Sequence, residues 1–173
     1  MRERHAARDA RRAAEFRTFV AGAAGRLLHT ATLLTAEAPG DNPRARRLLT
    51  LALAHTYARW DGLRGEDGED PYDRARRYLA TRFAHGVQRR HGVFGRARPR
   101  PRGPLARLTA RERLILVLRL YEGVAEEQTA ALLGLTGEHV RTVCDRAAAT
   151  VLHPPREPAP AAQRETAAGA AAS

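Results

Sequence analysis

The 173-residue sequence contains no lysine, one serine at its last position, Ser173, and one cysteine, Cys144. Without lysine the chain has neither a Walker-type phosphate-binding loop nor a residue that forms Schiff bases. A lone cysteine excludes an internal disulfide and a zinc site built from several cysteines. The seven histidines are scattered without the spacing of metal ligands. We therefore expect no enzyme, no metal or other cofactor, and no small-molecule substrate.

Long hydrophobic runs are also missing. The first apolar stretch, near residues 19–34, is interrupted by Arg26 and His29, and no run reaches the roughly 20 residues that span a bilayer. The N-terminus lacks the apolar centre of a secretory signal. These features predict a soluble, cytoplasmic protein that does not bind membranes.

Positive charge is abundant but unevenly placed. The 30 basic residues, all arginine, outnumber the 19 acidic ones and give a net charge of +11. Such a composition, rich in alanine and glycine, is typical of GC-rich coding, so the position of the charge is more informative than its sum. Residues 86–107 hold seven arginines and no acid, whereas residues 108–153 carry a net charge of −1.

The arginine-rich segment over residues 86–107 reads as a linker, because glycine, proline and arginine alternate without an apolar period. Its density of charge favours contacts with DNA phosphates, and a solvated linker is the alternative. The candidate phosphate contacts in it are Arg89, Arg90, Arg96 and Arg98. The alanine- and proline-rich tail over residues 154–173 has little to bury and is expected to be disordered.

Apolar residues at three- and four-residue steps predict three helices in residues 14–85, preceded by an N-terminal extension over residues 1–13. The predicted helices cover residues 16–34, 43–60 and 71–85. Asp41 or Asn42 is a candidate cap for the second one, with proline at its first position. No stretch alternates with period two, so we expect no sheet and assign the chain to the all-α class.

Start and stop signals divide residues 108–153 into three more helices. A capping box begins at Thr109, with glutamate three residues later, and Gly123 ends the first helix. Gly134 ends the second helix in the left-handed conformation that glycine tolerates. Thr136 caps the third helix, which is expected to run to about residue 152.

The segment over residues 128–143 has the spacing of a helix-turn-helix motif. Ala130 is small where two helices would cross, while Val140 and Val143 would dock the second helix onto the first. The opposite face of the second helix would then reach base edges or phosphates in a major groove. The candidate DNA contacts on it are Gly137, Glu138, Arg141, Thr142, Asp145 and Arg146. A plain helical hairpin is the alternative, and the net charge of −1 predicts weak intrinsic binding.

These residues resemble a family. The segment LTARERLILVLRLYEGVAEEQTAALLGLTGEHVRTVCDRAAATVL is similar to the C-terminal domain, region 4, of extracytoplasmic-function RNA polymerase sigma factors. It shares the opening pattern LxxRERxxxxLRxYEG and an ETAALLG-like helix. Upstream, the pattern Ala52-Leu53-x-x-Thr56-Tyr57-x-x-Trp60 resembles region 2 of the same family. The match spans about residues 14–153 and looks most like the short actinobacterial subgroup.

The resemblance implies an all-α fold of two small helical domains: a region 2-like bundle over residues 14–85 and a region 4-like helix-turn-helix over residues 108–153. A basic flexible linker would join them. It also implies a transcription initiation protein that binds core RNA polymerase and promoter DNA. The C-terminal domain would read the −35 element and the N-terminal domain the −10 element, with an anti-sigma factor as a further expected partner.

One stretch departs from the family. Where relatives carry an acidic AEDLVQE-like segment that docks on polymerase, this chain has Ala-Arg-Arg-Leu-Leu-Thr-Leu over residues 45–51. The altered polymerase-docking positions are Arg46, Arg47, Thr50 and Leu51. Arginines facing a basic docking surface would repel it. The alternative interpretation is a degenerate sigma-like DNA-binding regulator, or an anti-sigma decoy, that does not dock on polymerase.

Overall fold

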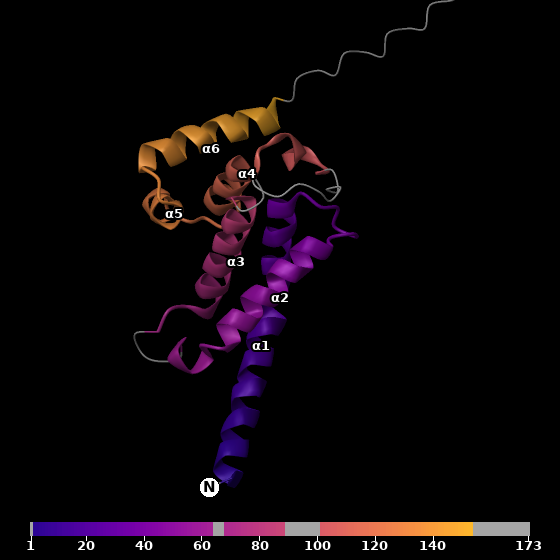
Figure 1. The fold of residues 1–173 in the computed structure, drawn as a ribbon, viewed down its shortest axis with the longest axis vertical. Helices are drawn as coiled ribbons and strands as arrows, with labels where there is room; N and C mark the ends of the chain where they lie inside the picture. Colours follow the sequence, from indigo (N-terminus) through magenta and orange to yellow (C-terminus); the bar gives the residue numbers. More distant parts are fainter. Residues whose placement is uncertain (1, 64–67, 89–100, 154–173) are drawn as a thin grey trace, which may run out of the picture.

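The computed structural model describes residues 2–63, 68–88 and 101–153, and the elements of this part of the chain are helices joined by turns and loops (Figure 1). The N-terminal module consists of α1 (Arg2–Thr35), α2 (Pro43–Tyr57) and α3 (Pro71–Gln88). The C-terminal module consists of α4 (Ala110–Leu116), α5 (Glu126–Leu133) and α6 (Gly137–Leu152). Shorter turns of helix are η1 (Trp60–Leu63), η3 (Pro104–Arg107) and the π-helical η4 (Val117–Tyr121).

The all-α prediction is confirmed over the described residues, where the only β-type pairing is an isolated bridge between Ala38 and Asp41. None of the helices in this part of the chain is long and apolar enough to cross a membrane. The candidate phosphate contacts Arg89, Arg90, Arg96 and Arg98, and the tail over residues 154–173, lie outside the described residues.

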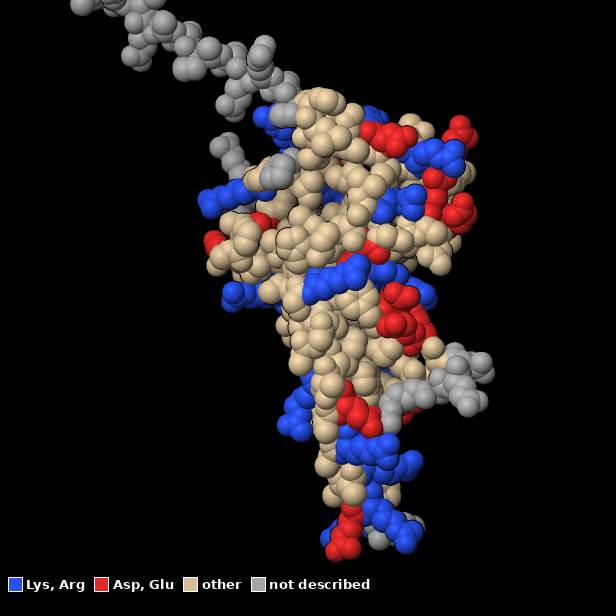
Figure 2. Space-filling view, turned by 180° about the vertical axis from the view of Figure 1, so that it is seen from behind, with Lys and Arg blue, Asp and Glu red and all other residues tan. Residues whose placement is uncertain are grey.

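α1 is longer than the apolar stripe predicts. It begins at Arg2 and its first turns project from the body of the molecule as an exposed helix (Figure 1). Figure 2 shows basic and acidic side chains along the visible face of those turns. The turns contain no apolar stripe, so periodicity could not reveal them. Alanine and arginine, which dominate there, are among the strongest helix formers.

Local signals set the ends of the helices in the C-terminal module. The hydroxyl of Thr109 accepts a hydrogen bond from the backbone N–H of Glu112, whose carboxylate accepts one from the N–H of Thr109, 2.8 Å away. Gly134 follows α5 with φ +66°, and Thr136 caps α6 by accepting from the N–H of His139. The predicted capping box, glycine stop and second cap are all confirmed.

The predicted side-chain cap of α2 is wrong. Asn42 occupies the cap position, but its side-chain amide is buried and donates to the hydroxyl of Thr32, 3.0 Å away, so it caps nothing. The carboxylate of Glu37 takes that role from the preceding loop. It accepts from the backbone N–H groups of Arg44 and Ala45 at 3.2 and 2.9 Å.

The two modules share a hydrophobic core. One buried cluster joins Leu34 of α1 and Leu79 of α3 to Leu114, Leu118 and Val124 of the C-terminal module. A second cluster lies within the C-terminal module, between α4, α5 and α6. α4 contributes to both clusters and therefore ties the helix-turn-helix to the N-terminal bundle.

Candidate nucleic-acid interface

The helix-turn-helix is assembled around small and branched side chains. Ala130 of α5 is 5% exposed, and Val140 and Ala147 of α6 are fully buried in the same cluster as Ile115 of α4. Since these residues face inward, the opposite side of α6 faces solvent. α6 lies across the outer end of the molecule, away from the projecting start of α1 (Figure 1).

The expected DNA-facing residues occupy that outer side. Glu138, Thr142 and Asp145 are exposed, and the side chains of Arg141 and Arg146 are 66% and 64% exposed. Gly137, at the first position of α6, is half-buried. The structure thus brings all six predicted residues onto one exposed helix; that they contact DNA stays a prediction.

Both arginines of this face are held by carboxylates from other helices. Arg141 donates through Nε and Nη2 to the two carboxylate oxygens of Glu126, at 3.1 and 3.0 Å. Hydrogen bonds and charge from Glu126 raise the pKa of Arg141, so it stays protonated. Nη2 of Arg146 lies 3.0 Å from Oε1 of Glu112.

Glu112 is itself fixed by the capping box. Its Oε2 accepts from the backbone N–H and the hydroxyl of Thr109, both at 2.8 Å. Burial acts to raise the pKa of Glu112, but these hydrogen bonds and the neighbouring Arg146 outweigh it and lower the pKa below its ordinary value. The carboxylate is therefore charged and immobilised beside the recognition helix.

Charges of both signs alternate over this end of the molecule. Figure 2 shows basic and acidic side chains interleaved where α5 and α6 lie. Each arginine of α6 has a carboxylate within 3.0 Å, and Glu138 and Asp145 add negative charge to the same helix. The local field therefore favours phosphates only weakly, in line with the net charge of −1 over residues 108–153.

The candidate polymerase-docking residues share the outer side of α2. Arg46, Arg47 and Thr50 are exposed and Leu51 is half-buried, whereas Ala52 on the opposite side is fully buried. Nε of Arg46 donates to the side-chain oxygen of Asn42, 3.0 Å away. The altered positions are thus available to a partner, and their docking role stays untested.

The junction between the modules contains a carboxylate that the sequence analysis did not single out. The side chain of Glu122 is 0% exposed. It accepts hydrogen bonds from the hydroxyl of Thr30 and, at 3.0 Å, from that of Tyr72. Arg26 and Arg76 lie 3.4 and 3.8 Å away. Burial and the nearby charge of Glu122 raise the pKa of Tyr72, so its hydroxyl stays protonated and donates.

A buried arginine makes the second polar contact between the modules. Arg113 of α4 is 7% exposed and donates from Nε to the backbone carbonyl of Leu34, 3.0 Å away, near the end of α1. It also donates to the carbonyl of Leu108 at 2.6 Å. A cation suits the negative end of a helix dipole, so Arg113 satisfies one terminal carbonyl of α1 while joining that helix to α4.

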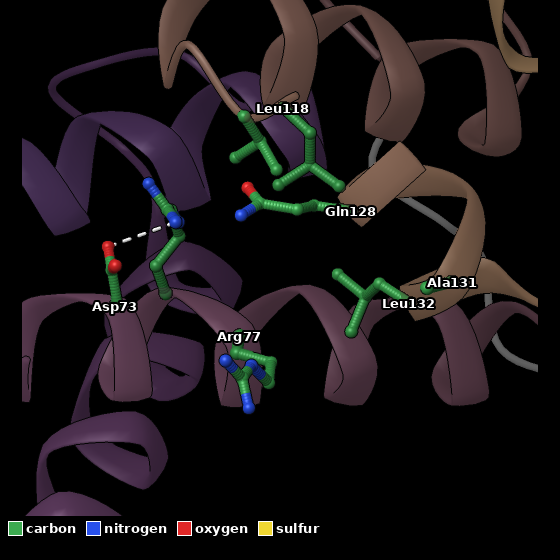
Figure 3. Close-up of a pocket in the computed structure, with 8 residues that line it drawn as sticks. Asp73, Arg77, Leu118, Gln128, Ala131 and Leu132 are labelled. Carbon is green, nitrogen blue, oxygen red and sulfur yellow. Dashed lines mark ion pairs between the residues drawn. The ribbon is translucent and has the colours of Figure 1, made fainter. Parts of the chain in front are cut away.

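A cavity of about 340 Å³ lies at the same junction, between α3, η4 and α5. Figure 3 shows Leu118, Gln128 and Leu132 facing α3 across this space. The two arginines on its α3 side are paired, Arg76 with Asp73 and Arg77 with Glu69, each at 2.9 Å. Both arginines that line the cavity are therefore already engaged in ion pairs.

Sequence reasoning missed Glu122, Glu126 and Arg113 as organising residues. Their partners are distant in the chain: Thr30 is 92 positions from Glu122, and Leu34 is 79 from Arg113. The one available signal was that charged residues, three arginines and two glutamates, stand within the largely apolar stretch of residues 108–124. Such residues must find partners when they are buried.

Residues 105–151 match the family model of sigma-70, region 4. No curated protein sequence matches the chain. Among solved structures, the chain is similar to the sigma factor RpoE in complex with the anti-sigma factor NepR from Bartonella quintana. The TM-score is 0.59 at 20% identity, over 82% of this chain and 99% of that one.

The anti-anti-sigma factor PhyR complexed with NepR, also from Bartonella quintana, aligns with a TM-score of 0.46 and 18% identity, over 78% of this chain and 49% of that one. The RpoE alignment shows a shared fold along almost the whole length of that sigma factor. The family match adds region 4 in the C-terminal module. Together they support a sigma-like transcription factor.

Proposed function

We propose that this chain is a sigma-factor-like transcription initiation protein that binds core RNA polymerase and promoter DNA and has no catalytic activity of its own. The main support is the exposed face of α6, presented by a helix-turn-helix within the segment that matches region 4. In this proposal α6 reads the −35 element and the N-terminal module binds the −10 element. As a transcription protein it would act in the cytoplasm.

The division of the chain follows from the same proposal. Residues 14–85 act as the region 2-like domain and residues 108–153 as the region 4-like domain. The arginine-rich linker over residues 86–107 adds sequence-independent contacts to phosphates through Arg89, Arg90, Arg96 and Arg98. An anti-sigma factor is a further proposed partner, because the similar RpoE structure was determined with one. The short length of the chain outside the two domains fits the short actinobacterial subgroup, and Arg46 and Arg47 would then mark an altered docking helix.

A second candidate is favoured by that divergence. Arg46 and Arg47 are exposed where the resembling family carries acids. A protein with this surface could keep the fold and DNA binding, or occupy an anti-sigma factor, without docking on polymerase. Reversing both charges, with Arg46→Glu and Arg47→Asp, tests this directly. Acids also suit the positive N-terminal end of α2.

The deciding experiment is a pull-down of purified core polymerase with the full chain, followed by run-off transcription from fragments of the source genome. Initiation at discrete sites supports the sigma-like function. DNA binding without polymerase capture supports the regulator instead. We expect weak capture by the wild type and stronger capture by the double variant, because two repulsive contacts become attractive. The gain in affinity is about a factor of ten for each 1.4 kcal/mol that the change contributes. Weaker capture by the variant would mean that the arginines themselves dock.

A further inference from the structure

Arg141 is held along one edge of its guanidinium. Nε and Nη2 donate to the two oxygens of Glu126 at 3.1 and 3.0 Å. A guanidinium carries five N–H donors in a rigid fork. The side-on pair with Glu126 uses two of them. The donors at the end of the fork, on Nη1 and Nη2, stay available to another acceptor. An end-on arginine can bond O6 and N7 of guanine in the major groove. The pair thus fixes the guanidinium without using its outer edge.

Glu126 is a firm support for that arrangement. It is the first residue of α5 and its side chain is 13% exposed, against 66% for Arg141. Gly137 begins α6 directly beside it: a Cβ at this glycine would stand 3.1 Å from Oε1 of Glu126. The absence of a side chain at position 137 therefore leaves room for the carboxylate between the two helices of the motif.

A related arrangement, with one contact instead of two, lies five residues further along α6. Arg146 lies 3.0 Å from Oε1 of Glu112, while Oε2 of Glu112 is bound by Thr109. In both cases an exposed arginine of α6 is braced by a partly buried carboxylate of another helix. Because both exposed arginines of α6 are paired in this way, we expect the pairs to affect how the helix binds DNA.

Bracing changes what an arginine binds. A free guanidinium swings to the nearest phosphate and contributes affinity that does not depend on sequence. Arg141 must give up two charge-assisted hydrogen bonds to do so, whereas an end-on contact with a base edge leaves both intact. The carboxylate also repels phosphates. Both effects shift binding energy from the backbone to the bases.

We propose that Glu126 is a specificity-determining positioning residue, which holds Arg141 for end-on contact with a guanine and keeps it from phosphates. The inference rests on the proposed function, since it requires that α6 enters a major groove. It assigns a role to a residue of α5 that does not itself face the DNA.

The test uses the full chain and its Glu126→Gln variant, which keeps the shape of the side chain and removes the charge. Each is first selected against a library of random duplexes. Each is then titrated with the wild-type selected duplex and with random duplex at several salt concentrations. Glu127→Gln is the matched control, because it removes the same charge from the next, exposed position of α5.

For Glu126→Gln we expect tighter binding to random duplex and a salt dependence steeper by about one unit of slope, as for one added phosphate contact. The preference for guanine at one position, about fivefold or more for a bidentate contact, should fall towards one. Glu127→Gln should keep that preference and the wild-type slope. Thermal melting of both variants at the wild-type temperature establishes that they are folded.

The outcomes separate the two proposals. A wild type that selects no sequence contradicts the proposed DNA-reading function and the role of Glu126 with it. A wild type that selects a guanine-containing site, with Glu126→Gln retaining the same guanine preference and salt slope, overturns the positioning role alone. Equal loss of preference in Glu126→Gln and Glu127→Gln also overturns it, because the effect would then be one of net charge.

Discussion

Two carboxylates of this molecule pair with arginines, and the two sites differ in how far they are exposed to water. Glu122 lies at the junction of the modules with a 0% exposed side chain and is bound by two hydroxyl groups as well as by arginines. The side chain of Glu126 is 13% exposed and holds an arginine that is 66% exposed. Both pairs bridge distant segments, but only the carboxylate of Glu122 is wholly removed from water.

The surroundings decide what each pair contributes. A buried carboxylate has lost its hydration, so it is tolerable only with a full set of partners, and removing it leaves those partners unpaired. An exposed pair is solvated whether or not it forms, and typically contributes between 0 and about 1 kcal/mol. Glu122 therefore bears on how firmly the modules are joined, whereas Glu126 bears on where a guanidinium points.

The largest expected effect is on the junction. Glu122→Ala should lower the free energy of unfolding by about 3–5 kcal/mol, the range for breaking a buried charged network by removing one member. The hydroxyl of Tyr72 would lose its acceptor. The hydroxyl of Thr30 would keep only the carbonyl of Arg26, and Arg76 would keep only its pair with Asp73. Urea denaturation of the full chain, followed by circular dichroism, measures the change.

Two variants calibrate that result. Glu122→Gln should cost less than Glu122→Ala, because an amide oxygen still accepts hydrogen bonds from Thr30 and Tyr72. Glu126→Gln, at the exposed pair, should change the free energy of unfolding by less than about 1 kcal/mol. Equal losses in the free energy of unfolding at positions 122 and 126 would contradict the proposed difference between the two sites.

The second effect concerns DNA. Arg141→Ala should weaken binding to the selected duplex by about 1–3 kcal/mol, the usual range for a base-reading arginine, and change binding to random duplex little, because Glu126 already occupies two of its donors. Fluorescence anisotropy with both duplexes measures the difference. An equal loss of affinity for both duplexes would instead identify Arg141 as a phosphate contact that does not read the sequence.

The same contrast explains what the sequence could predict. The capping box at Thr109, the left-handed Gly134 and the cap at Thr136 are local signals, and each lies where it was expected. The exposed face of α6 followed from the periodicity of its buried residues. Partners chosen by the tertiary fold could not be read locally: the side chain of Asn42 turned away from its cap position to the hydroxyl of Thr32.

The partners of Glu122 and Glu126 are also chosen by the tertiary fold. Tyr72 is 50 positions from Glu122, and Arg141 is 15 from Glu126. No helical or strand period links such residues, so only the packing of α4 and α5 against their neighbours brings them together. α1 was underestimated for a different reason, because its first turns depend on the helix propensity of alanine and arginine rather than on an apolar face.

The smallest expected effect concerns the carboxylate that pairs with Arg146. It depends on whether this carboxylate stabilises the fold through its negative charge. The carboxylate, that of Glu112, has a pKa below the ordinary value of 4.5, because hydrogen bonds from Thr109 and the charge of Arg146 outweigh the opposing effect of burial. In the unfolded chain the group takes up its proton at a higher pH than in the folded one. The stabilisation is therefore complete above the unfolded pKa and is lost as the pH falls through the folded pKa.

Glu112→Gln should thus be less stable than the wild type by about 1 kcal/mol at pH 7, the usual contribution of a helix cap, and the difference should shrink as the pH falls below 4.5. Chemical denaturation of both proteins from pH 7 to pH 3 measures it. In a Thr109→Ala background the pH-dependent part should decrease, because the hydroxyl no longer binds the carboxylate. A difference that stays constant with pH would mean that Glu112 acts through its shape alone, and that the brace on Arg146 is no stronger than an ordinary surface contact.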